Sequence, residues 1–154
     1  MVKMTIEKAR DLERILKYEF KDIGLLIDAM NVTKISKRKQ PYHNGALAVV
    51  GDAILKAVLA DYFYFQLKKE GSDIHAETVT TEKLALENNG VLHAAAKELN
   101  LMNYAWNDGT TTIPTGGHDL YVEAVVAAIF HDSGFDKCKE WILTFLLPLL
   151  QKNK

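Results

Sequence analysis

The chain has 154 residues, of which 48% are hydrophobic and 25% are charged, and its formal net charge is −1. The length indicates one domain, the hydrophobic fraction excludes a disordered chain, and the near-neutral charge argues against coating nucleic acid by charge alone. The single cysteine, Cys138, excludes an intrachain disulfide framework. An intracellular location is therefore expected, cytoplasmic or, alternatively, in an organelle or the nucleus. No membrane association is expected, because the apolar run 141–150 is shorter than the roughly 20 residues that span a bilayer.

Helical periodicity predicts an all-α fold. The spacing of apolar residues predicts helices, in chain order, near residues 6–16, 25–30, 46–68, 77–87, 91–99, 118–131 and 135–150. Thr5 and Asp22 are the expected N-caps of the first two. Loops are predicted over 34–44 and 101–117, and Asn107-Asp108-Gly109 in the second favours a small hairpin. Helices 46–68 and 118–131 are apolar on all sides, which is typical of two central helices in a single-domain bundle over residues 1–154.

Basic residues are concentrated near the start of the chain. Residues 1–42 have a charge balance of +4 and residues 43–154 a balance of −5. The excess comes from four residues of the first loop: Lys34, Lys37, Arg38 and Lys39. A run this short is usually a solvated loop, and the alternative is a contact with the phosphates of RNA.

Two acidic residues stand among apolar neighbours in the two central helices. Asp52 follows Gly51 in the first helix, and Glu123 lies in the second. A carboxylate in such surroundings is costly unless it is paired, hydrogen-bonded or bound to a cation. Two inward carboxylates would make half of an oxygen-ligand site for Mg²⁺. The alternative is structural, with Asp52 accepting hydrogen bonds and Glu123 paired with a Lys or Arg.

Four segments in the right order resemble the motifs of the ribonuclease III domain. Residues 16–30 resemble LGYxFKDxxLLxEAL, residues 43–55 HNERLEFLGDAVL, residues 84–101 RSALVNNETLAEIARELGL, and residues 123–135 DAFEALIGAIYLDGGF. The resemblance covers residues 10–145 and implies a ribonuclease III-like helical bundle. No double-stranded RNA-binding domain is expected within the chain.

The resemblance implies an active site of four carboxylates. Such a set holds two divalent cations, which activate water and stabilise the leaving oxygen of a phosphodiester. In this chain Ala48 and Leu120 stand at two of the four positions, so Asp52 and Glu123 are the retained catalytic and metal-binding candidates. Asp119 is a possible substitute, because it shares an i, i+4 helix face with Glu123. The expected cofactor is Mg²⁺ or Mn²⁺ if the site is active, and none otherwise.

The family also dimerises through the helix that carries the second motif. The resemblance therefore implies a homodimer, with an interface formed by Leu47, Val49, Val50 and Ala53. Three functions remain open. The first is a catalytically impaired homodimer, a pseudoenzyme that binds duplex RNA or a protein partner. The second is a divergent but active Mg²⁺-dependent endoribonuclease that cleaves double-stranded RNA in RNA processing. The third is a structural scaffold subunit of a larger ribonucleoprotein.

Overall fold

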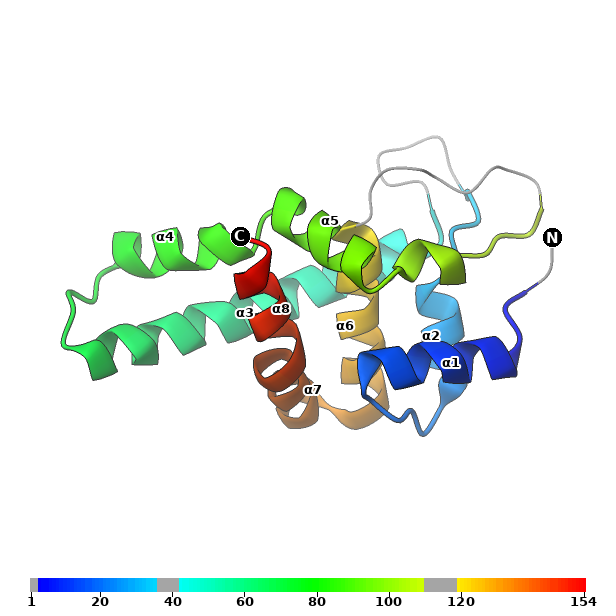
Figure 1. Cartoon of the computed structure of the whole chain (residues 1–154), viewed down its shortest axis with the longest axis horizontal. Helices are drawn as coiled ribbons and strands as arrows, with labels where there is room; N and C mark the ends of the chain where they lie inside the picture. Colours follow the sequence, from blue (N-terminus) through cyan, green and yellow to red (C-terminus); the bar gives the residue numbers. More distant parts are fainter. Residues whose placement is uncertain (1–2, 36–41, 110–118) are drawn as a thin grey trace.

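A computed structural model describes residues 3–35, 42–109 and 119–154 of the chain. Every regular element in these ranges is helical, as predicted, and only two isolated β-bridges accompany the helices (Figure 1). The elements are α1 (Ile6–Leu16), α2 (Ile23–Ala29), α3 (Gly45–Glu70), α4 (Ala76–Leu86), α5 (Asn89–Glu98), the 3₁₀-helix η1 (Leu101–Tyr104), α6 (Asp119–Ser133), α7 (Phe135–Trp141), the π-helix η2 (Ile142–Leu146) and α8 (Leu147–Lys152).

Side-chain caps begin three of the helices. The Thr5 side chain accepts a hydrogen bond from the backbone of Lys8 at 3.1 Å, and the Asp22 side chain accepts one from Gly24 at 3.0 Å. Asn88 caps α5 in the same way. Each cap satisfies a backbone N–H that has no partner inside the helix. The two caps predicted from the sequence are therefore confirmed.

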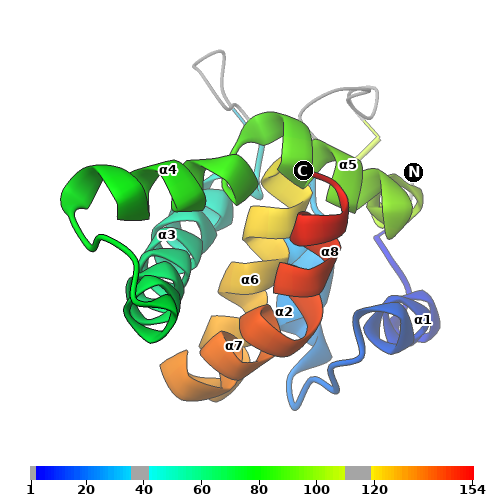
Figure 2. The same cartoon turned by 60° about the vertical axis from the view of Figure 1, so that its left-hand side comes forward.

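Helix α6 is the centre of the domain. Its residues 121–129 are all buried, and it packs against α2, α3, α5 and α7. Figures 1 and 2 show it surrounded by these helices in both views. Removing a large aliphatic side chain from water contributes roughly 1.5–3 kcal/mol, so this all-round burial supplies much of the core. No described helix is both long and apolar enough to cross a membrane.

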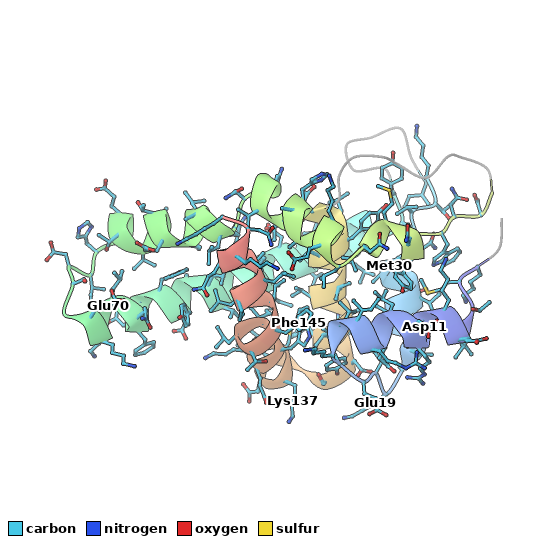
Figure 3. The ribbon with its side chains drawn as sticks, in the orientation of Figure 1. Asp11, Glu19, Met30, Glu70, Lys137 and Phe145 are labelled. Atoms are coloured by element: carbon cyan, nitrogen blue, oxygen red, sulfur yellow. The ribbon has the colours of Figure 1, made fainter. Side chains whose placement is uncertain are left out.

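Helix α3 lies beside α6, as predicted, but only one of its sides is buried. The side toward α6 carries Ala48, Gly51 and Leu55, whereas Val49 and Ala53 are exposed. The second half of α3 runs beyond the body and pairs with α4 to form an arm (Figure 1). Glu70, the last residue of α3, lies at the free end of this arm (Figure 3).

The sequence predicts a hairpin around Asn107, but the residues before this turn do not form its first strand. Residues 101–104 form η1, and Trp106 bridges to Asn31 at the end of α2. The indole Nε1 of Trp106 also donates a hydrogen bond to the Ile27 carbonyl at 2.8 Å. This segment is therefore anchored by α2. The far half of the predicted hairpin, residues 110–117, lies outside the described residues.

Candidate functional site

The site begins where α3 crosses α6. Gly51 lies directly against the backbone of Glu123, and a Cβ added to Gly51 would stand 1.6 Å from the Glu123 carbonyl oxygen. Only glycine permits so close an approach of two helices. Because Asp52 follows Gly51 on the same helix, the close crossing also brings the Asp52 side chain next to Glu123.

A cavity of about 280 Å³ opens at this crossing. Its lining comes from three parts of the chain: Ala48, Val49, Asp52 and Lys56 on α3; Glu87 and Asn89 at the junction of α4 and α5; and Asp119, Leu120 and Glu123 on α6. The structure thus brings together the three acidic residues predicted from the sequence. Ala48 and Leu120, which stand where the resemblance implies two further carboxylates, line the same cavity.

Glu123 is held in an environment that favours its neutral form. Only 8% of the residue is exposed. Burial raises the pKa of Glu123 to about 8, helped by a hydrogen bond with Asp52 and by the negative charges of Asp52 and Asp119. The cavity therefore favours the protonated form of the Glu123 carboxyl.

A lysine ammonium group enters the cavity beside these carboxyls. Lys56 Nζ lies 2.9 Å from Asp52 Oδ2 and 3.7 Å from Glu87 Oε1. The hydrogen bond to Asp52 and the charge of that group raise the pKa of Lys56, which keeps the ammonium charged. Glu87 is buried and has a second partner, Lys83 Nζ, at 2.8 Å from Oε2.

Sequence reasoning did not identify Lys56, Glu87 or Asn89 as site residues. The signal for Lys56 was available, because it follows Asp52 by four positions on one helix and such a pair meets on the helix surface. Glu87 directly precedes Asn88-Asn89 of the third motif, although nothing local shows that this junction reaches α3 and α6. Its place in the cavity is a product of tertiary packing.

The residues present do not fit the two-cation site that the resemblance implies. The side chains of Ala48 and Leu120 carry no oxygen, and Lys56 occupies Asp52 Oδ2. Within the described ranges no group of three or more His, Cys, Asp or Glu side chains could hold a metal ion. Mg²⁺ is bound through one or two carboxylates together with several waters. Since lysines pair with Asp52 and Glu87, too few free carboxylates remain for two cations.

The remaining predicted residues lie outside the cavity or at its edge. Val49 is exposed at the edge of the cavity, Ala53 is exposed on the same helix, and Leu47 and Val50 are half-buried there. Of the four basic residues, Lys34 is exposed and does not line the cavity. Lys37, Arg38 and Lys39 lie outside the described residues.

Comparisons with known proteins agree on one family. A family model described as "Ribonuclease-III-like" matches residues 30–150. Ribonuclease 3 of Campylobacter jejuni is 32% identical over 148 residues, which cover 92% of this chain and 61% of that protein. Ribonuclease 3 of Clostridium acetobutylicum is 33% identical over 141 residues, which cover 86% and 59%. The chain therefore spans less than two thirds of the length of these curated relatives.

Solved structures show the same relationship in three dimensions. The nuclease domain of Campylobacter jejuni ribonuclease III matches with a TM-score of 0.72 at 29% identity, and the match covers 94% of each chain. A second structure of that domain, with the same TM-score, was described for structural flexibility in the region involved in dimer formation. The motifs, the helical fold and the family match therefore lead to one conclusion: the chain belongs to the ribonuclease III-like family.

Proposed function

We propose that this chain is a catalytically impaired ribonuclease III-like domain that binds duplex RNA as a homodimer and does not cleave it. One observation carries the proposal: Ala48 and Leu120, which stand at two positions where the resemblance implies carboxylates, both line the cavity. Two divalent cations need four carboxylates to balance their charge. Four acidic residues line this cavity, but Asp52 and Glu87 are paired with lysines, and burial favours the neutral form of Glu123. The position of Lys56 at Asp52 supports the same proposal.

Asp119 is the only acidic residue on α6 that could compensate for Leu120 within the described part of the chain. It lines the cavity and lies one turn before Glu123 on the same face. The negative charge of Asp119 helps to raise the pKa of Glu123. We therefore propose that Asp119 leaves the site without catalytic activity.

The exposed part of α3 supports the dimer. Val49 is 64% exposed, Ala53 is exposed, and Leu47 and Val50 are half-buried beside them. Contiguous apolar surface on a soluble protein is usually covered by a partner. The related Campylobacter jejuni domain has a region involved in dimer formation, which makes a second copy of this chain the partner we propose.

The direct test is incubation with long duplex RNA in Mg²⁺ or Mn²⁺ at low ionic strength, where phosphate contacts are strongest. We expect a gel shift without cleavage products. Ribonuclease 3 of Campylobacter jejuni is the positive control, and the Asp52→Asn variant reveals contaminating nuclease. Cleavage by the wild type that is lost in Asp52→Asn would show an active enzyme. Absence of any shift would leave a protein partner as the alternative.

The dimer is tested separately with a matched pair of variants. Val49→Glu places a charge on the exposed part of α3, where Val49 is 64% exposed. Ile35→Glu places one on a residue that is 65% exposed and lies outside that helix. We expect light scattering to give a dimer mass for the wild type and for Ile35→Glu, and a monomer mass for Val49→Glu. A monomeric wild type at micromolar concentration would contradict the proposal.

A further inference from the structure

Lys56 joins carboxylates that come from two separate segments. Its Nζ contacts Asp52 on its own helix at 2.9 Å and Glu87, at the junction of α4 and α5, at 3.7 Å. Glu87 is buried, although it ends a helix that is otherwise mostly exposed. Lys56 therefore does more than form an ion pair within α3, because it also contacts the buried carboxylate of Glu87.

We infer that the Lys56 ammonium takes the place of a divalent cation in this cavity, linking Asp52 to Glu87 and excluding Mg²⁺. The inference deepens the proposed function, on which it rests, by naming the residue that now supplies positive charge to the site. The positive charge of Lys56 also explains how the carboxylates of Asp52 and Glu87 remain close together without a metal ion.

The chemistry of the two cations makes them mutually exclusive. An ammonium is a compact charge with three hydrogen-bond donors, and Lys56 directs it at Asp52 Oδ2. Mg²⁺ binds oxygen at about 2.0–2.1 Å and would need that same carboxylate as a ligand. A cation bound there would face the Lys56 charge across a short distance inside the cavity. Metal binding therefore requires Lys56 to leave.

Lys83 provides a matched control for the ammonium. It pairs with Glu87 at 2.8 Å, closer than Lys56 does, and it precedes Glu87 by four positions on α4. Unlike Lys56, it does not line the cavity. Lys83→Met therefore removes a positive charge from the same carboxylate without opening the cation position.

The experiment compares the thermal unfolding of the wild type, Lys56→Met and Lys83→Met, with Mg²⁺ or Mn²⁺ against NaCl of equal ionic strength. Both variants should melt below the wild type in metal-free buffer, because each leaves a carboxylate without its partner. Only Lys56→Met should regain stability from the divalent cation. A cation at one hundred times its Kd raises the melting temperature of a protein this size by roughly 5–10 °C.

Direct Mn²⁺ binding gives a second readout that does not depend on melting. The Mn²⁺ electron paramagnetic resonance signal should fall on addition of Lys56→Met, or of Lys56→Gln if the Met variant does not fold, and stay unchanged with the wild type. Equal Mn²⁺ binding by wild type and Lys56 variants would overturn the inference, as would binding by neither. These results concern cation binding alone, whereas cleavage of duplex RNA by the wild type would overturn the proposed function itself.

Discussion

Two acidic residues of α6, Glu123 and Asp132, lie nine positions apart in the sequence, and their side chains have different surroundings. Asp132, in the last turn, accepts hydrogen bonds from the Tyr18 hydroxyl at 2.7 Å and from the backbone of Lys21 and Asp22 at 3.0 and 2.9 Å. Partial burial alone would raise the pKa of Asp132, but these hydrogen bonds outweigh it and lower the pKa. Glu123 is more deeply buried, its hydrogen-bond partner in the described residues is another carboxyl, and its pKa is raised.

The different surroundings of Asp132 and Glu123 distinguish a carboxylate that stabilises the fold from one that does not. Asp132 ties the turn between α1 and α2 to the end of α6. Glu13 is also buried, and it accepts hydrogen bonds from Arg10 Nη1 at 2.8 Å and from the Phe20 backbone at 2.6 Å. The hydrogen bonds that Asp132 and Glu13 accept therefore account for the presence of these carboxylates in the fold. Stability does not explain Glu123, whose burial beside Asp52 is costly without a cation or a proton.

The largest expected effect is at the crossing that positions Glu123. Gly51→Ala places a methyl group 1.6 Å from the Glu123 carbonyl oxygen, so α3 and α6 must separate. We expect a loss of about 3 kcal/mol or more in the free energy of unfolding, measured by urea denaturation.

Gly90→Ala is the control for this prediction. Its added Cβ meets only a side-chain oxygen of Asn88, at 3.3 Å, in the first turn of α5. We expect a change within about 1 kcal/mol of the wild type. Similar losses for the two variants would show that the close helix crossing does not limit stability.

An intermediate effect is expected at Asp132. Asp132→Asn weakens three hydrogen bonds to a charged acceptor and should cost about 2 kcal/mol at pH 7. Because the pKa of Asp132 is lowered by folding, its contribution is present above the ordinary pKa of 3.8 and is lost as pH falls through the lower, folded value. The difference between the wild type and the variant should therefore narrow in acid.

Denaturation curves at pH 7 and pH 3 check this prediction. Asp136→Asn, an exposed acidic residue in the first turn of α7, should stay within about 0.5 kcal/mol of the wild type at both pH values. A gap between wild type and Asp132→Asn that widened in acid would contradict the assigned role.

At pH 5 the smallest effect is expected at Glu123. Its raised pKa means that the folded state binds a proton more tightly than the unfolded state does. The stability that this proton contributes is fully present below about pH 4.5 and is lost as the pH rises through about 8. Glu123→Gln removes this dependence, so the variant should match the wild type at pH 5 and exceed it at pH 9. At roughly 1.4 kcal/mol per pKa unit, the shift from 4.5 to about 8 makes this difference several kcal/mol. A variant less stable at pH 9 would show that the ionised carboxylate is stabilised.

The helical pattern of the sequence is sufficient to place the two long helices and the Asp52–Glu123 pair. A segment as apolar as residues 120–130 has to be buried. The same pattern does not distinguish burial by the chain itself from burial by a partner. Helix α3 therefore has the composition of a central helix and yet leaves Val49 and Ala53 exposed.

Contacts between distant segments account for what the sequence did not predict. The position of Glu87 beside Lys56 depends on how the α4–α5 junction folds back on α3. Likewise, Trp106 pairs with α2, some 75 residues earlier, and not with residues across its own turn. Local propensity carries no information on either contact, because both depend on tertiary packing.

The contrast between the two carboxyls can be measured in a single titration by carbon-13 NMR of the side-chain carboxyl groups. We predict that Asp132 titrates below its ordinary pKa of 3.8 and that Glu123 titrates near 8. We further predict that added Mg²⁺ leaves the Glu123 midpoint unchanged, because Lys56 occupies the Asp52 carboxylate that the cation would need as a ligand. A Glu123 midpoint near 4.5, or one that falls when Mg²⁺ is added, would contradict the account and indicate a working metal site.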